Sequence, residues 1–267
     1  MGGRVTQRAA PWRYAAVSVQ GTAHHRDGTP CQDYGLVDVV PAPYDGQVLI
    51  AVAADGAGSA VNAGLGAIRT CEAFASFQRL KVPWSPFQFV PDIADAILRD
   101  VIDHIEEEAA GMSEDASAFA CTLLGCVIQD DLALFVQVGD GAMVYRVDPD
   151  PEWKLALPSH RGEFVGETVF VTSPDARRQM RVRTVEQPIS EIALMTDGVE
   201  FLAIRQATAT PHAPFLEHVM RGLRLERQAG YSLDHHRFLE EFLASAGVCE
   251  RTDDDKTLIL ASRRAMG

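Results

Sequence analysis

Several features that would assign this chain to other protein classes are absent. Its five cysteines, among 267 residues, are odd in number and form no Cys-x-x-Cys pair, so we expect neither a disulfide framework nor a structural zinc site. The longest uninterrupted apolar run, residues 48–54, is far too short to cross a bilayer. The first 20 residues contain no apolar core of signal-peptide length. These absences predict a cytoplasmic protein with no membrane partner.

Positive charge is also scarce. The chain has 24 Lys and Arg against 37 Asp and Glu, a formal net charge of −13. Nucleic acids and anionic membranes are bound by basic surfaces, so we expect neither as a partner. Hydrophobic residues make up 47% of the chain, enough to offset the entropic cost of ordering it. We expect one folded domain over residues 1–267.

The spacing of apolar residues predicts a strand-rich first half interrupted by two helices. Alternating or continuous apolar segments predict strands, and a 3.6-residue period predicts helices. Neighbouring strands with helices in separate pairs favour an α+β sandwich over a repeating βαβ fold. The predicted strands are 14–19, 34–40, 48–53, 119–128, 132–138, 142–147, 153–157, 168–172, 180–185, 189–195 and 257–260, and the predicted helices are 63–80, 89–110, 215–225 and 233–246.

Aspartates stand at the ends of several predicted strands. Asp55 follows VLIAVAA, Asp140 follows LALFVQVG, Asp197 follows IALMT, and Asp254 stands just before TLIL. A buried unpaired carboxylate is costly, so such a set suggests convergence on cations. Ligation by oxygen alone selects Mg²⁺ or Mn²⁺ over Zn²⁺ or copper.

Glycine adjoins three of these aspartates, in Asp55-Gly56, Gly139-Asp140-Gly141 and Asp197-Gly198. Glycine permits tight turns and lets the backbone approach a ligand closely, so that its carbonyl can coordinate a metal ion. A single Asp-Gly pair is a common turn. The prediction of a metal site therefore depends on the set of aspartates and not on any one of them.

Five segments, in this order, resemble the motifs of the metal-dependent PP2C-type (PPM) serine/threonine protein phosphatases, and more closely those of their compact bacterial branch. The segments are CQD (31–33), AVAADGAGS (51–59), residues 120–146, MTDGVE (195–200) and DDDKTLIL (253–260), and a sixth, residues 162–172, resembles the stretch before the last metal motifs. The resemblance implies a four-layer αββα sandwich, in which helix pairs flank two mainly antiparallel β-sheets. It also implies a site for two Mn²⁺ or Mg²⁺ ions at one end of the sandwich.

The resemblance carries metal-binding roles to individual residues. Asp55 would bridge both ions, and the Gly56 carbonyl would bind one of them. Asp197 and Asp254 would complete the shell of the other ion. We expect these four residues to form the binuclear centre.

Two more aspartates have secondary roles in the resemblance. Asp33 would act through bound water, and Asp140 matches the aspartate that family members use for a further, weaker metal ion. Members with a third ion often have an aspartate four residues after the one that corresponds to Asp197. Phe201 stands at that position, which argues against a third ion.

The segment before Asp33 departs from the family pattern. Members commonly have a phosphate-binding arginine a few residues before this motif, whereas this chain reads HHRDGTP at 24–30, with a slightly different spacing. Arg26 or His25 could substitute for that arginine. Eukaryotic members also have a histidine after Asp-Gly that can act as a general acid, but this chain has Ala57. Protonation of the leaving oxygen would fall to His25, His24 or metal-bound water.

The activity implied is hydrolysis of phosphoserine and phosphothreonine in proteins by a metal-activated water. Two ions lower the pKa of a shared water and neutralise the phosphoryl oxygens, so no covalent phosphoenzyme is required. The cysteines then need no catalytic role, and we expect them to be small buried or half-buried hydrophobic residues. Family relatives in bacteria often accompany a Ser/Thr kinase, which suggests a kinase partner. We expect the phosphatase to be a monomer.

Two alternatives remain open from the sequence. The altered His/Arg segment is compatible with a catalytically weak or inactive member of the same fold that binds a phosphoprotein or a kinase. A metal-dependent hydrolase of small phosphoesters would use the same centre but prefer metabolites to phosphopeptides.

Overall fold

The computed structural model describes residues 10–42, 46–81, 91–158 and 168–264. Its strands are β1 (Arg13–Val19), β2 (Tyr34–Ala42), β3 (Gly46–Ala54), β4 (Leu123–Gln129), β5 (Leu132–Val138), β6 (Ala142–Val147), β7 (Lys154–Leu155), β8 (Arg181–Val185), β9 (Ile189–Met195), β10 (Ile204–Arg205), β11 (Thr210–Pro211), β12 (Gly230–Tyr231) and β13 (Lys256–Ser262). Its helices are α1 (Thr22–Asp27), α2 (Ala63–Lys81), α3 (Pro91–Met112), α4 (Ala176–Gln179), α5 (Asp197–Ala203), α6 (Ala213–Leu225), α7 (Leu233–Leu243) and α8 (Ala246–Cys249), with a 3₁₀ turn, η3 (Ala116–Phe119).

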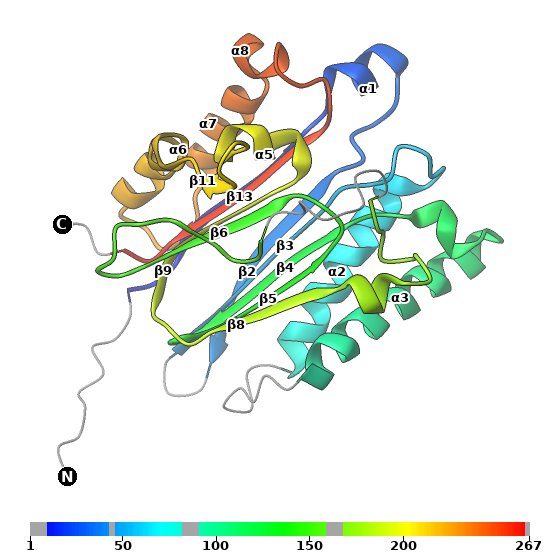
Figure 1. Ribbon diagram of the computed structural model, residues 1–267, viewed down its shortest axis with the longest axis horizontal. Coiled ribbons are helices and arrows are strands. Elements are labelled where there is room, and N and C mark those ends of the chain that lie inside the picture. Colours follow the sequence, from blue (N-terminus) through cyan, green and yellow to red (C-terminus); the bar gives the residue numbers. More distant parts are fainter. Residues whose placement is uncertain (1–9, 43–45, 82–90, 159–167, 265–267) are drawn as a thin grey trace.

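Two β-sheets lie face to face between two layers of helices (Figure 1). One sheet has the strand order β2-β3-β4-β5-β8 and is antiparallel throughout, with α2 and α3 on its outer face. The other has the order β12-β1-β13-β9-β6-β7 and is antiparallel except for the pair β1–β12. Its outer face packs on α5, α6 and α7. The predicted α+β, four-layer αββα sandwich is confirmed.

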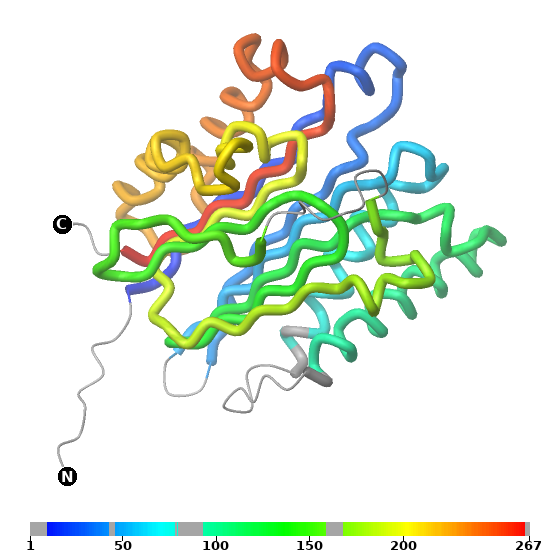
Figure 2. Tube along the Cα trace, viewed as in Figure 1, coloured from blue at the N-terminus to red at the C-terminus, as the bar shows by residue number. Residues whose placement is uncertain are grey.

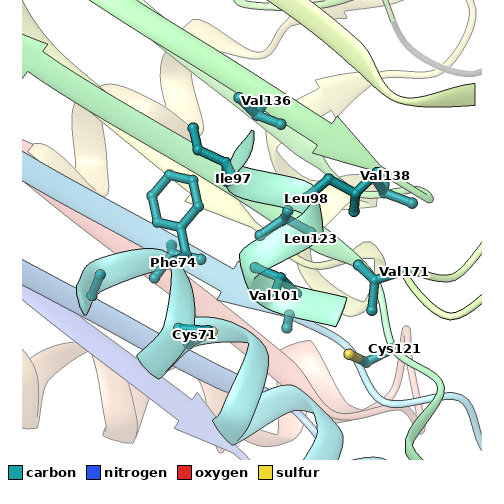
Figure 3. Close-up of a cluster of buried hydrophobic side chains, with 14 of the residues drawn as sticks. Cys71, Phe74, Ile97, Leu98, Val101, Cys121, Leu123, Val136, Val138 and Val171 are labelled. Atoms are coloured by element: carbon teal, nitrogen blue, oxygen red, sulfur yellow. The ribbon is translucent and has the colours of Figure 1, made fainter. Parts of the chain in front are cut away.

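Apolar contacts fill three layers of this sandwich. Alternate residues of β3 face opposite ways, so that Leu49 lies between the sheets while Ile50 packs under α2 and α3. Because β3 is buried on both faces, its sequence is a continuous apolar run and not an alternating one. Figure 3 shows the layer under α2 and α3, where Phe74 and Ile97 lie beside Val136 of β5.

Most predicted elements occur within a few residues of their expected ends, with four corrections. Residues 119–122 belong to the end of η3 and an extended link, so the strand begins at Leu123 and not at Phe119. Residues 168–172 form a turn, in which Phe170 N–H bonds to Ser173 Oγ at 3.0 Å, and not a strand. The predicted helix 233–246 ends at Leu243, and α8 follows separately. Residues 24–26, read as loop, lie in the short helix α1.

Two predictions extend outside the described residues: the start of the helix expected at residue 89 and residues 162–167 of the sixth motif. Within the described residues, no helix is both long enough and apolar enough to span a membrane.

Candidate active site

Strand pairing in the first sheet places Asp33 beside Asp55. Asp33 directly precedes β2 and Asp55 directly follows β3, and the terminal residues Tyr34 and Ala54 are paired partners. An antiparallel pair brings the start of one strand next to the end of its neighbour. Two aspartates 22 positions apart in the sequence therefore meet at one end of the sheet.

The second sheet delivers three more aspartates to its own strand ends. Met195, the last residue of β9, pairs with Ala142 at the start of β6 and with Leu258 near the start of β13. Asp140 lies two residues before β6, Asp197 two residues after β9, and Asp254 two residues before β13. The predicted strand-end aspartates therefore come from both sheets.

The backbone around Asp55 is tightly fixed. Its N–H donates to Thr122 Oγ1 at 2.9 Å, and its carbonyl accepts from Thr122 N at 2.8 Å. Gly56 then lies so close to its neighbours that a Cβ there would approach Ala63 O and Gln32 O to 2.8 Å. Only glycine fits this position, which leaves its carbonyl in a fixed, close-packed turn.

Asp140 occupies a turn that depends on two glycines. Gly139 and Gly141 have φ angles of 89° and 85°, a region that favours glycine. The buried Gln137 amide donates to the carbonyls of residues 139, 140 and 141 at 3.1–3.3 Å and so holds the turn. Thr168 Oγ1 donates to Asp140 Oδ2 at 2.9 Å, which brings the segment after residue 167 to the site.

The Asp33 and Asp55 carboxyl groups lie close enough to each other that each shifts the pKa of the other. Burial is the main cause that raises the pKa of both groups, and the neighbouring carboxylates Asp33, Asp197 and Asp254 raise that of Asp55 further. Thr196 Oγ1 donates to Asp33 Oδ2 at 2.7 Å and accepts from Thr257 N at 2.9 Å.

Asp197 lies in the same negative field. Burial is the main cause, and repulsion from Asp140, Asp254 and Asp33 a further cause, that together raise its pKa to about 7. The five aspartates are thus near enough to repel one another electrostatically. Such a cluster gains most from a cation, which replaces the bound protons.

The donor set fits a hard divalent cation. Asp140 Oδ1 is buried without a hydrogen-bond partner, and the other donors are carboxylate and carbonyl oxygens, which suit Mg²⁺ or Mn²⁺. Among the described residues, no group of three Asp, Glu, His or Cys side chains is already arranged so that it could hold a metal ion. Binding therefore requires the carboxylates to turn toward the ion.

Helix α1 lies at the same end of the sandwich, yet its three basic residues differ in their surroundings. The Arg26 side chain is 71% exposed and pairs with the exposed Asp27. His25 is exposed as well. His24 is only 23% exposed, and its Nδ1 bonds to Asp255 Oδ2 at 2.9 Å. The structure therefore places Arg26 and His25 outward on α1, and their catalytic roles stay predictions.

Asp255 is a site residue that sequence reasoning missed. Its buried carboxylate accepts from Gly21 N at 2.6 Å, from Gln32 N at 2.5 Å and from His24 Nδ1. It therefore joins the strand end that carries Asp254 to the segment before Asp33. The sequence could have indicated Asp255 only by its position just before β13. In the run Asp253-Asp254-Asp255, however, the sequence does not show which side chain is buried.

Arg181 of β8 is a second residue that the sequence analysis did not single out, and it lies beside the aspartates. Its Nη2 donates to Gly139 O at 3.2 Å. Burial lowers its pKa, while Glu200 and Asp140 act in the opposite direction. This guanidinium balances part of the negative charge on the Asp140 side of the site.

Comparison with known proteins identifies the family. The sequence profile of the protein phosphatase 2C family matches residues 20–244, a span that includes Asp33, Asp55, Asp140 and Asp197 but ends before Asp254. The chain is 32% identical over 250 residues to serine/threonine-protein phosphatase 3 of Escherichia coli (strain K12), covering 94% of this chain and 98% of that protein. This chain belongs to the protein phosphatase 2C family.

Solved structures share the fold at lower identity. The serine/threonine phosphatase Stp1 from Staphylococcus aureus superposes with a TM-score of 0.60 at 14% identity, over 98% of this chain and 99% of that one. RsbX, crystallised in complex with magnesium, gives a TM-score of 0.56 at 13% identity, over 96% and 97% of the two chains. The αββα arrangement therefore extends over the whole length of these proteins.

Proposed function

We propose that this protein is a Mg²⁺- or Mn²⁺-dependent phosphatase that hydrolyses phosphoserine and phosphothreonine in proteins. The observation that carries the proposal is the convergence of five aspartates from both sheets at one end of the sandwich. Membership of the protein phosphatase 2C family and the similarity to a named serine/threonine-protein phosphatase support it.

The chain would hold two ions through Asp55, the Gly56 carbonyl, Asp197 and Asp254, with Asp33 acting through bound water. When bound, such ions activate a water molecule and neutralise the phosphoryl oxygens. Asp140 is a further oxygen donor on the side where Arg181 already supplies positive charge. That charge opposes a third ion, in agreement with the two ions that we propose.

The inactive alternative has no support in the site, because every carboxylate that the binuclear centre needs is present. The phosphorylated substrate would be a protein, with a Ser/Thr kinase as the opposing enzyme. We further propose that the enzyme works in the cytoplasm as a monomer, built as one domain over residues 1–267.

Substitution of Asp55 tests the proposal. Purified protein should hydrolyse p-nitrophenyl phosphate and a phosphothreonine peptide with Mn²⁺ and lose both activities in EDTA. Asp55→Asn should lose turnover by at least about a thousandfold, because one neutral oxygen is a poor bridge between two cations. The neighbouring exposed Asp253 supplies the control, and Asp253→Asn should keep wild-type rates.

Retained activity in Asp55→Asn would contradict the assignment of the bridging ligand. Mn²⁺-dependent turnover of small phosphoesters without any turnover of phosphopeptides would instead favour the metabolite hydrolase. Circular dichroism of both variants checks that the fold is unchanged.

A further inference from the structure

His24 is held in place by a carboxylate that is almost fully buried. The His24 Nδ1–Asp255 Oδ2 distance is 2.9 Å, and only 1% of the Asp255 side chain is exposed. An ionised carboxylate can only accept hydrogen bonds, so the proton of this contact belongs to Nδ1. This bond fixes the orientation of the imidazole ring and leaves its Nε2 without a hydrogen bond among the described residues.

The helix that carries His24 is packed against the end of the site. Ala23 N donates to Asp253 O at 2.9 Å, and a Cβ on Gly21 would approach Asp253 O to 2.4 Å. The start of α1 therefore rests directly on the backbone that leads into Asp254. His24 cannot shift along this surface without breaking the contacts of Asp255.

Asp255 also connects the His24 imidazole to the segment that leads into Asp33. The same carboxylate oxygen that binds His24 accepts from Gln32 N, and Gln32 O accepts from Gly56 N at 3.2 Å. The Asp255 carboxylate, in the residue next to Asp254, thus links His24 to the backbone of Gln32, which contacts Gly56. His25 has no comparable position, since its side chain is exposed on the next step of the helix.

We propose that His24, oriented by Asp255, is the proton donor to the serine or threonine oxygen that leaves phosphorus. This inference depends on the proposed phosphatase function. An imidazole whose Nδ1–H is bonded to a carboxylate can carry a second proton on Nε2 and release it there. Removal of a positioned acid typically costs about 10²–10⁴-fold in rate.

The oxygen of a water molecule forms a bond to phosphorus while the ester P–O bond breaks, and the electron pair of that bond stays on the serine or threonine oxygen. This oxygen takes the proton from His24 Nε2 and leaves as the free hydroxyl. The proton that the attacking water releases returns His24 to its charged form, so the net reaction is ester plus water to alcohol plus phosphate.

A histidine far from the site supplies the control. His104 of α3 is exposed, and its Nδ1 also lies near a carboxylate, 3.6 Å from Asp100 Oδ2. We would measure kcat of wild type, His24→Asn and His104→Asn on a phosphothreonine peptide and on p-nitrophenyl phosphate. An alkoxide leaving group needs a proton, whereas p-nitrophenolate leaves without one. Asparagine at position 24 can still donate to Asp255 but has no proton to transfer, so it separates the chemical role from the positioning role.

The expected result is that His24→Asn loses much more kcat on the phosphothreonine peptide than on p-nitrophenyl phosphate. The kcat of His24→Asn should fall about 10²–10⁴-fold on the peptide and less than about tenfold on p-nitrophenyl phosphate, while His104→Asn should stay within about twofold on both. Equal losses on both substrates in His24→Asn, or a larger loss on the peptide than on p-nitrophenyl phosphate in His104→Asn, would overturn the inference. Absence of turnover by the wild type would overturn the proposed function, and the inference with it.

Discussion

Gly198 packs directly against the strand end that carries Asp254 and Asp255. A Cβ at this position would lie 1.9 Å from Asp255 O, a distance that no real contact allows. Gly198→Ala should therefore displace α5 or the start of β13 and destabilise the protein by about 3 kcal/mol. Because both segments carry proposed metal ligands, we also expect a loss of Mn²⁺ binding. Thermal unfolding and calorimetric titration with Mn²⁺ measure the two effects.

Gly111 provides the control for this substitution. It lies in α3, and no heavy atom of a neighbouring group lies within 4 Å of the place that a Cβ would occupy, so Gly111→Ala fits without contact. Alanine is also the better helix former, by about 0.5–1 kcal/mol. Gly111→Ala should be neutral or stabilising, and a stable, metal-binding Gly198→Ala protein would contradict the packing described for α5.

At this scale, the sequence points to the aspartates of the proposed metal site more readily than to the residues that hold them in place. Asp55, Asp140 and Asp197 could be picked out because each follows a long apolar run, a local pattern. Asp255 could not, since its partners Gly21, His24 and Gln32 lie more than 220 positions away and are brought near by folding. Arg26 was chosen by analogy with a family arginine, but which side chains of α1 face inward depends on how that helix docks.

Among the elements, α6 is joined to the outer face of the second sheet by an ionic cluster. Glu191 of β9 is fully buried and accepts from Arg146 of β6 at 3.1 Å and from Arg224 of α6 at 2.5 and 2.8 Å. Glu217 of α6 bonds to the same two arginines and accepts from Trp153 Nε1 at 3.0 Å. Two acidic and two basic groups therefore compensate one another where a single buried charge would destabilise the fold.

This cluster predicts a specific sensitivity to acid. Burial alone would raise the pKa of Glu217, but hydrogen bonds from Arg224, Trp153 and Arg146 outweigh it and lower the pKa to about 2 from the ordinary 4.5. A lowered folded-state pKa means that the stabilisation is fully present above about pH 4.5 and is lost as the pH falls toward 2. Glu217→Gln should therefore be less stable than wild type at pH 6, and the difference should shrink at pH 3. Urea unfolding at several pH values measures it.

Glu241 of α7 is an exposed carboxylate and serves as the comparison. Glu241→Gln should track the wild type at every pH. A difference between wild type and Glu217→Gln that stays constant from pH 6 to pH 3 would show that the Glu217 charge does not contribute through these bonds.

Long elements were predictable and short ones were not. Helices α2 and α3 and strands β3, β5 and β9 have enough residues for their periodicity to be read. Helix α1 has six residues and no buried side chain, so no apolar pattern marks it. Residues 168–172 alternate like a strand, but they find only isolated backbone partners such as Cys121 O.

For the whole molecule, the metal ions should act as cross-links. Their proposed ligands come from the ends of both sheets, so only the folded chain can bind them. A ligand at 100 times its Kd stabilises a protein by about 2.7 kcal/mol, which for a chain of this size is a rise in Tm of about 5–10 °C. Mn²⁺ added to EDTA-treated protein should produce that rise, and thermal scans with and without the ion measure it.

The Asp55→Asn protein distinguishes stabilisation by Mn²⁺ bound at the proposed site from a general effect of added salt on Tm. Its Tm should be insensitive to Mn²⁺ at concentrations that stabilise the wild type. An equal rise in both proteins would mean that the ions bind elsewhere on the acidic surface.

The pairing of β1 with β13 extends over seven residues and joins positions 13–19 to positions 256–262, as Figure 2 shows in the neighbouring blue and red segments. In the cell, the ribosome supplies these partners in sequence, at about 5–20 residues per second. The first strand must wait for the last before the centre of its sheet closes, and Asp254 arrives with that last strand. Translation itself therefore keeps the nascent chain from acting on phosphoproteins until β13 has left the ribosome.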